Sequence, residues 1–369
     1  MISKACVIGA YQRKLEEIGQ HRNVDLTVIV PPAWNENGQS IKLDRRFLKG
    51  YNLVVESMRF NGRYHLHFYW GIRRQISKIM PDIIHIDEEP YNLATFQSTW
   101  LGKRAGAKTV FFTWQNIHRR YPPPFRWVEQ YILNHADAAI AGNHEAARVV
   151  RTKGYQGPVD IIPQFGVDPE IYKLSASATK IAKSPFVIGY AGRLVPEKGL
   201  AVLLRAVSGI KGDWQLKILG AGPQLNDLTR QAVRDQIDDR ISFEAYVPSD
   251  QMPAFFSQLD AFVLPSQTQA NWKEQFGRVL IEAMACEVPV IGSTCGEIPN
   301  VVGDAGLIFQ EGNAHELRQC LERLMFQVTL RHNLAKAGRK RVLACYTQEH
   351  IAEQTVALYH KMMGALQYE

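Results

Sequence analysis

Two glutamates, Glu274 and Glu282, stand eight residues apart on either side of Gly277. Glu282 lies in an otherwise apolar run, residues 279–285, whose pattern is typical of a buried helix. A carboxylate there is costly to bury unless a partner hydrogen-bonds it, and a ligand rich in hydroxyl groups would do so. Gly277 would let such a ligand approach the backbone, and a helix beginning there would point free N–H groups at it. In the simpler alternative, one glutamate complements the helix dipole and the other faces solvent.

Two basic residues, Arg193 and Lys198, form a second candidate group. Arg193 follows an apolar run with strand character, and Lys198 comes five residues later at the start of a helical run. Two cations beside a helix N-terminus, with Gly192 and Gly199 next to them, would bind an anion such as a diphosphate. The alternative for each cation alone is a solvated loop side chain.

Short apolar runs with strand character alternate with helical stretches along the whole chain. This alternation indicates parallel βαβ units, and two sets of them predict an α/β fold with two doubly wound parallel sheets. The strands expected in the first half are residues 5–8, 26–30, 83–86, 109–113, 138–141 and 159–162. Those expected in the second half are residues 186–190, 215–219, 241–244, 261–264, 288–291 and 306–309.

Length and composition suit a globular protein of two domains. The chain has 369 residues, of which 46% are hydrophobic and 21% charged. Residues 167–185 have weak periodicity, so we expect a linker there, and residues 348–363 have a helical pattern. The sequence has no run of 18 apolar residues and no signal-peptide pattern, and its five cysteines are scattered. We therefore expect a cytoplasmic protein without a disulfide framework or a zinc site.

The excess of positive charge lies entirely in the first half. Residues 1–180 contain 24 Lys and Arg against 16 Asp and Glu, whereas residues 181–369 contain 19 against 20. This favours an anionic partner for the first half, such as a membrane surface or a phosphorylated acceptor. Residues 67–80 and 119–127 mix aromatic and basic side chains and suit a membrane interface, although residues 67–80 also fit a helix that packs on a sheet. Because no aromatic-basic platform is evident, we expect no nucleic-acid partner.

Several sequence motifs follow one another in the second half of the chain, and their order resembles that of a known protein family. They are 189–199 (GYAGRLVPEKG), 260–266 (DAFVLPS), 274–282 (EQFGRVLIE), 286–293 (CEVPVIGS), 296–302 (GEIPNVV) and 306–309 (GLIF). Together they resemble the donor half of the family-4 retaining glycosyltransferases of the GT-B fold, the glycosyl transferases group 1. The resemblance implies two Rossmann-like domains facing a central cleft: an acceptor domain over residues 1–170 and a donor domain over residues 171–348. A last helix, residues 349–369, would cross back to the first domain.

The resemblance also implies roles for the donor half. Gly192, Arg193 and Lys198 would bind the diphosphate of a nucleotide sugar. The positive charges of Arg193 and Lys198 would take the place of a metal ion there. Glu274 would contact the sugar hydroxyls, helped by the backbone of Phe276 and Gly277. Glu282 would bind the ribose, and the base would lie near Tyr246 and Val247. The sequence places no Asp-x-Asp motif to hold a metal on the diphosphate, so we expect no metal and no cofactor.

Sequence motifs identify the residues expected to contact the acceptor less clearly. The family often has a histidine after the strand at residues 109–113, and His118 is the best match, with Asn116 close by and His85 as the next candidate. The implied catalytic set is therefore His118, Arg193, Lys198 and Glu274. Gly9 is all that remains of the glycine-rich turn expected after the first strand. The acidic residues Asp87, Glu88 and Glu89 fit either an acceptor-side loop or a solvated turn, and fit a metal site less well.

We expect a retaining, metal-independent hexosyltransferase. Its donor would be a UDP- or GDP-hexose and its acceptor a glycan or a lipid-linked molecule in cell-envelope or exopolysaccharide biosynthesis. Membrane association would be peripheral, at the inner face. The alternative is a degenerate GT-B protein that binds nucleotides as a scaffold without transfer. A dinucleotide-dependent oxidoreductase is disfavoured, because no G-x-G-x-x-G motif follows the first strand.

Overall fold

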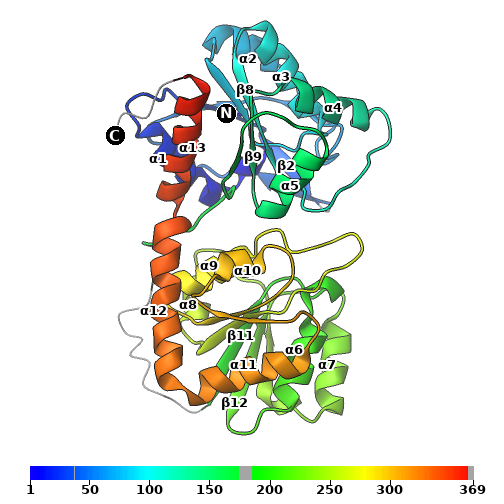
Figure 1. Cartoon of the computed structure of the whole chain (residues 1–369), viewed down its shortest axis with the longest axis vertical. Coiled ribbons are helices and arrows are strands. Elements are labelled where there is room, and N and C mark those ends of the chain that lie inside the picture. Colours follow the sequence, from blue (N-terminus) through cyan, green and yellow to red (C-terminus); the bar gives the residue numbers. More distant parts are fainter. Residues whose placement is uncertain (37, 174–184, 365–369) are drawn as a thin grey trace. The chain divides into compact units, whose positions relative to one another are not determined.

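The computed structural model describes residues 1–36, 38–173 and 185–364, which form two compact units (Figure 1). Unit 1 comprises Met1–Phe165 together with the segment that begins at Gln348, and unit 2 comprises Gly166–Thr347. The boundaries predicted from the sequence were close to these, after residue 170 and after residue 348. Each unit carries a parallel sheet with helices around it, so the predicted α/β class is confirmed. The greater part of the expected linker, residues 174–184, lies outside the described residues.

Unit 2 is a doubly wound parallel sheet. Its strands are β11 (Phe186–Ala191), β12 (Trp214–Leu219), β13 (Ile241–Glu244), β14 (Ala261–Leu264), β15 (Val290–Ser293) and β16 (Leu307–Phe309). Its helices are α6 (Leu200–Ser208), α7 (Leu225–Arg234), α8 (Met252–Phe256), α9 (Arg278–Ala285), α10 (Ile298–Val302), α11 (Ala314–Phe326) and α12 (Val328–Cys345), with short 3-10 helices at Pro196–Lys198 and Asp238–Arg240. The strand expected at residues 288–291 begins two residues late, and the other expected strands of this half are present.

The strand order of unit 2 is β13-β12-β11-β14-β15-β16. The chain winds outward from β11 in one direction as far as β13, and then returns to the other side of β11 to form β14. The loops that follow β11 and β14 therefore open beside each other at the point where the winding direction reverses, which is the topological switch point of the sheet. In open parallel sheets, this is where ligands bind.

Unit 1 also contains a parallel sheet with helices around it, but its strands are less regularly arranged than those of unit 2. Its strands are β1 (Thr27–Val30), β2 (Ala33–Glu36), β3 (Gln39–Lys42), β4 (Asn52–Val55), β5 (Met58–Arg59), β6 (Phe68–Tyr69), β7 (Ile83–Ile86), β8 (Lys108–Thr113), β9 (Ala138–Ala141) and β10 (Val159–Ile161). Its helices are α1 (Arg13–Gly19), α2 (Ile72–Ile79), α3 (Leu93–Arg104), α4 (Phe125–His135), α5 (His144–Thr152) and α13 (Gln348–Met362), with 3-10 helices at Ala5–Val7 and Gly9–Gln12. Two parallel groups, β10-β9-β8-β7 and β1-β4, form the sheet, and two hairpins, β2-β3 and β5-β6, lie outside it.

The predicted first strand at residues 5–8 is wrong. Ile2, not this segment, joins the two groups of strands, because it forms parallel bridges with Ile29 of β1 and Ile86 of β7. The Ile2 amide donates to the His85 carbonyl at 2.8 Å, and the Asp87 amide donates to the Ile2 carbonyl at 2.9 Å. Residues 5–7 then coil into a 3-10 helix. The switch point of unit 1 consequently lies between the residues that follow Ile2 and those that follow β7.

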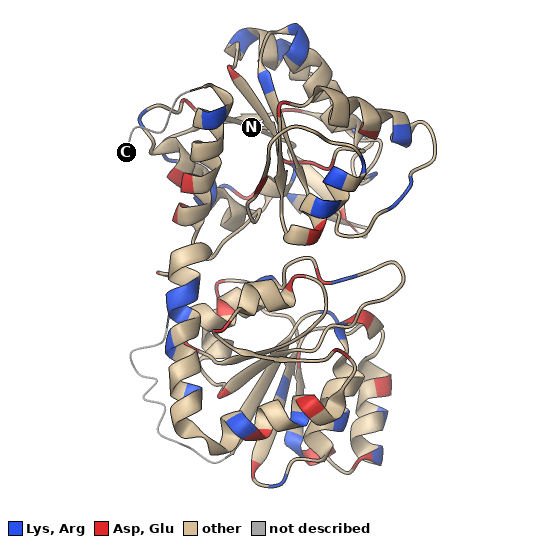
Figure 2. Cartoon of the chain, in the orientation of Figure 1, with Lys and Arg blue, Asp and Glu red and all other residues tan. Residues whose placement is uncertain are grey.

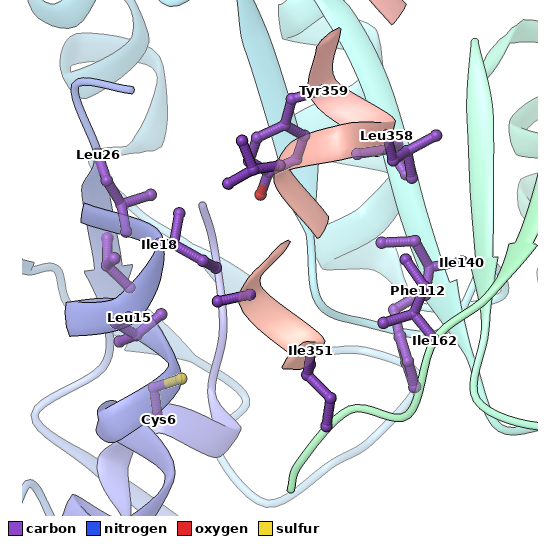
Figure 3. Packing of buried hydrophobic residues seen from close by; sticks show 14 of the residues in the cluster. Cys6, Leu15, Ile18, Leu26, Phe112, Ile140, Ile162, Ile351, Leu358 and Tyr359 are labelled. Carbon is purple, nitrogen blue, oxygen red and sulfur yellow. The ribbon is translucent and has the colours of Figure 1, made fainter. Parts of the chain in front are cut away.

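Helix α13 completes the core of unit 1. It packs along α1, although the two helices come from opposite ends of the chain (Figure 1). Ile351 and Leu358 of α13 lie in one buried cluster with Leu15 and Ile18 of α1 and with Phe112 of β8 (Figure 3). Each such side chain contributes roughly 1.5–3 kcal/mol when fully buried. The helix expected over residues 349–369 thus spans Gln348–Met362, and residues 365–369 lie outside the described part.

Among the described residues, none of the helices has the length and apolar character that crossing a bilayer requires.

Candidate active site

Lys198 and Glu274 meet at the switch point of unit 2. Lys198 follows β11 and Glu274 follows β14, and Lys198 Nζ lies 2.6 Å from Glu274 Oε2. The two loops can approach this closely because residue 199 is glycine. Gly199 has a φ of +69°, and a Cβ atom there would lie 1.9 Å from the Pro265 carbonyl oxygen. The hydroxyl of Ser266 donates to the same Glu274 oxygen at 2.8 Å.

Arg193 lies in the loop of Lys198 but is much more accessible. Its side chain is 65% exposed, and Nη2 lies 3.6 Å from Glu197 Oε1. Gly192, which precedes it, has a φ of +154° and is also exposed. The loop after β11 therefore presents two cations, the accessible Arg193 beside Glu197 and the largely buried Lys198 paired with Glu274.

Glu282 lies one turn into α9, beyond the cap at Gly277, which has a φ of +79°. Its carboxylate is 2.8 Å from Arg278 Nε and also contacts the Tyr172 hydroxyl. Burial raises the pKa of Glu282, and Arg278 and Tyr172 partly offset this. Glu274 and Glu282 are each only 7% exposed, so the alternative in which one of them faces solvent is wrong.

The remaining residues that the sequence predicted on the donor side lie near the carboxyl ends of the strands. Tyr246 and Val247 follow β13, and Tyr246 is 73% exposed. The side chain of Phe276 is buried and packs edge-on against Tyr346, with 5.7 Å between ring centroids. Gly296 is close enough to the Glu274 backbone that a Cβ atom would lie 2.1 Å from its carbonyl oxygen. The motif around Gly296 therefore supports the loop that carries Glu274.

Three consecutive carboxylates, Asp87, Glu88 and Glu89, occupy the switch point of unit 1. Asp87 accepts a hydrogen bond of 2.7 Å from the Ser3 hydroxyl. Glu88 is paired with the Lys4 ammonium. Asp87 and Glu88 are at most 3% exposed, and Glu89 is partly buried, so the interpretation of these residues as a solvated turn is wrong.

Glu89 connects this cluster to the loop after β8. It accepts hydrogen bonds from the Thr113 hydroxyl at 2.7 Å and from the Trp114 amide at 2.8 Å. Asn116, further along this loop, is buried, whereas His118 is exposed. Glu89 therefore fixes the start of the segment that carries His118.

The other two acceptor-side candidates lie inside the fold. Gly9 is buried in a 3-10 helix, where a Cβ atom would lie 2.5 Å from Asp44 Oδ2. His85 is also buried, and its Nδ1 lies 2.7 Å from the Tyr359 hydroxyl of α13. In the described part of the chain, the His, Cys, Asp and Glu side chains form no group of three that could hold a metal ion.

Sequence reasoning missed several partners of the site residues: Lys4, Tyr172, Ser266, Trp272 and Arg278. Ser266 stands inside a motif that the sequence had singled out, and Arg278 precedes Glu282 by one helical turn. Those two could have been found from spacing. Lys4 and Tyr172 lie too far from their partners along the chain to be paired from sequence alone.

Comparison with known families agrees with this geometry. Residues 173–341 match the family described as glycosyl transferases group 1, and residues 8–164 match the glycosyl transferase 4-like domain. The protein is thus a glycosyltransferase of the GT-B fold. Specifically, it belongs to the glycosyl transferases group 1, as the motifs had indicated.

Individual relatives are distant. The 2-deoxystreptamine glucosyltransferase of Streptomyces kanamyceticus is 25% identical over 69% of this chain and 68% of its own length. The capsular polysaccharide biosynthesis glycosyltransferase CapM of Staphylococcus aureus is 30% identical over 52% of this chain, which spans only half of the CapM length. Anabaena HepE, whose structure was solved with UDP and glucose, shares the fold, with a TM-score of 0.70, 17% identity and 98% coverage of both chains.

Proposed function

We propose that the protein transfers a hexose from a nucleoside diphosphate sugar to a glycan or lipid-linked acceptor, with retention of configuration and without a metal ion. The observation that carries this proposal is the meeting of Lys198 and Glu274, 2.6 Å apart, at the switch point of unit 2. One is a cation suited to a diphosphate, and the other a carboxylate suited to sugar hydroxyls. Assembly of an envelope glycan or exopolysaccharide is the pathway that we propose, and the likeness to CapM supports it.

The donor would bind along the loops of unit 2. Lys198 and the exposed Arg193 would take the diphosphate, and Glu274 the sugar hydroxyls. Glu282 would accept hydrogen bonds from the two ribose hydroxyls, because a buried carboxylate gains most from donors that replace water. The base would lie against the exposed Tyr246 after β13. The likeness to HepE supports a uridine nucleotide, and a guanosine nucleotide fits these contacts equally well.

Transfer would proceed on the face from which the diphosphate departs. The acceptor oxygen bonds to the anomeric carbon as the bond to the phosphate oxygen breaks, and the bonding electrons pass to the diphosphate. The acceptor proton moves to a phosphate oxygen of the leaving group. Arg193 and Lys198 would stabilise the charge that develops there, and loss of one such contact costs about 3 kcal/mol. The exposed His118 and the partly buried Glu89 that fixes its loop are the groups that we assign to the acceptor side.

An anionic membrane surface is the proposed partner of unit 1. Helix α2 buries Ile72 and Ile76 in the fold, and its basic residues, which are exposed, are blue in Figure 2. Phe60 and Trp70, on the adjoining β5-β6 hairpin region, are 55% and 65% exposed. This combination of aromatic and basic side chains would suit the headgroup region of a bilayer.

A screen of nucleotide sugars for thermal stabilisation tests the proposal. A donor at 100 times its dissociation constant adds about 2.7 kcal/mol of stability. The stabilising donor is then incubated with acceptors, and the linkage of the product is determined by NMR. Retention of the donor's anomeric configuration is expected, and an inverted product would contradict the mechanism. Stabilisation without transfer or hydrolysis of any donor would favour a nucleotide-binding scaffold instead.

A further inference from the structure

The cation and the carboxylate that the donor needs are bound to each other. Lys198 Nζ lies 2.6 Å from Glu274 Oε2, and their side chains are only 16% and 10% exposed. Water therefore screens this pair weakly, and the ion pair is a structural element of the site.

The loop between β14 and α9 holds the Lys198 ammonium in this position. Its Trp272 places an indole ring 5.0 Å from Lys198 Nζ, a geometry that attracts a cation to the ring face. Trp272 is fixed by a hydrogen bond of 2.8 Å from the Gln269 amide to its carbonyl oxygen. The start of the loop is anchored by the Thr268 hydroxyl, which donates to Glu311 at 2.9 Å. The ammonium thus lies between a fixed aromatic ring and a buried carboxylate.

A ligand whose phosphates draw Lys198 away from Glu274 breaks this pair. A free nucleoside diphosphate would draw Lys198 to its phosphates and offer no group in exchange to Glu274. The carboxylate would then stay buried without its cation, which is strongly unfavourable. A nucleotide sugar would supply both replacements, because its phosphates receive Lys198 while its sugar hydroxyls donate to Glu274.

We propose that the Lys198–Glu274 ion pair makes the site discriminate against the free nucleoside diphosphate and in favour of the intact nucleotide sugar. This inference rests on the proposed function. Its consequence for turnover is that re-forming the pair expels the diphosphate product after the sugar has left. The discrimination is built into the site before any ligand binds.

Glu274→Gln is the variant that tests this, because it keeps the shape of the side chain and removes the charge that holds Lys198. Calorimetry with UDP and UDP-glucose measures both affinities, with GDP and GDP-mannose used if the uridine pair does not bind. The variant should bind the nucleoside diphosphate about tenfold more tightly than the unmodified protein, with no such gain for the nucleotide sugar. Unchanged or weaker binding of the diphosphate would overturn the inference.

Two further variants distinguish an effect of the ion pair on diphosphate affinity from an effect of general electrostatics or of misfolding. Glu197→Gln removes a nearby negative charge that faces Arg193, so diphosphate affinity should change by less than about threefold. A gain equal to that of Glu274→Gln would refute the specific pair. Ser266→Ala removes a second donor to Glu274, so it should weaken diphosphate binding by about threefold. Tighter binding in this variant would contradict the inference, whereas absence of binding by every nucleotide to the unmodified protein would instead refute the proposed function.

Discussion

Glu88 and Glu89 are consecutive residues at the end of β7, and their environments shift their pKa values in opposite directions. Burial alone would raise the pKa of Glu88, but the Lys4 ammonium and His67 lower it to about 2. Burial raises the pKa of Glu89 to about 7, because the Thr113 hydroxyl and the Trp114 amide compensate only part of the lost hydration. One carboxylate is therefore fixed as an anion within the fold, and its neighbour changes charge near neutral pH.

The pair of Lys4 and Glu88 should be required for the stability of unit 1. Lys4→Met would leave a buried carboxylate without its cation, at a cost of about 3 kcal/mol. The matched control is Lys108→Met, since Lys108 pairs with Asp137 at 3.6 Å but is 51% exposed, and its loss should cost less than about 1 kcal/mol. Urea denaturation of both variants measures the difference. Equal losses would mean that the Lys4 pair contributes no more than a surface pair does.

Glu89 should make the protein less stable as the pH rises towards neutrality. The pKa of Glu89 lies above its ordinary value of 4.5, so the folded state keeps a proton that the unfolded state has lost. The contribution of this group is complete below about pH 4.5 and is lost as the pH rises through about 7. Glu89→Gln should abolish that dependence, which denaturation midpoints between these pH values would detect. Parallel curves for the variant and the unmodified protein would contradict the assignment.

The sequence predicted the regular parts of both sheets because their strands are short, apolar and bounded by polar residues. It failed where hydrogen bonding rather than hydrophobicity sets the element. The apolar residues 5–8 look like a strand, but Ile2 takes the strand position, and residues 5–7 form a 3-10 helix. The β2-β3 hairpin was missed because its strands are polar and largely exposed, although an Asn-Gly pair at residues 37–38 is a known hairpin signal.

The residues of the proposed donor site could be identified from the sequence, but their contacts could not. Arg193, Lys198, Glu274 and Glu282 were all identified from motifs. Arg193 and Lys198 each stand beside a glycine, Glu274 is three residues before Gly277, and Glu282 lies in an apolar run. The Lys198–Glu274 pair joins residues 76 positions apart, and it depends on the strand order that places β11 beside β14. No local pattern encodes that adjacency, so the pairing appears only in the folded structure.

Chelation should leave activity intact. Arg193 and Lys198 are the groups that we assign to the diphosphate, so transfer or donor hydrolysis should proceed at an unchanged rate in EDTA. Arg193→Gln should lower the rate, because one positive charge would be missing where negative charge develops, and a loss of about 3 kcal/mol in transition-state stabilisation is expected. Activity that EDTA abolishes and Mg²⁺ restores would count decisively against a metal-independent reaction.

Glu282 should control nucleotide affinity rather than sugar affinity. Glu282→Gln would remove the charge that we assign to the ribose hydroxyls, so UDP should bind about tenfold more weakly, or GDP if the protein uses guanosine donors. This is the opposite direction from the effect expected for Glu274→Gln. Arg278→Gln is the matched control, because it disrupts the same ion pair, 2.8 Å long, while keeping the carboxylate. An equal loss in that variant would assign the effect to the packing of α9 instead of ribose binding.

Unit 1 should bind anionic lipid reversibly through the β5-β6 region and α2. Phe68 links the two exposed rings, with centroids 6.1 Å from Phe60 and 6.4 Å from Trp70, and Arg59 lies 5.0 Å from the Trp70 ring. The exposed basic residues of α2 are Arg73, Arg74 and Lys78. Each cation near an anionic surface contributes about 1 kcal/mol, so a few suffice for weak docking.

Flotation with phosphatidylserine-containing vesicles at low and high salt would measure this binding. High salt should release the protein, because exposed charges are screened within roughly 8 Å at physiological ionic strength. The double variant Phe60→Ser and Trp70→Ser should float less, since it removes the apolar side chains that enter the interface. Phe326→Ser is the control, because Phe326 is 64% exposed but belongs to unit 2, whose residues 166–347 contain 20 Lys and Arg against 19 Asp and Glu. If the unmodified protein does not float at low salt, the basic surface of unit 1 is better explained by a phosphorylated, water-soluble acceptor.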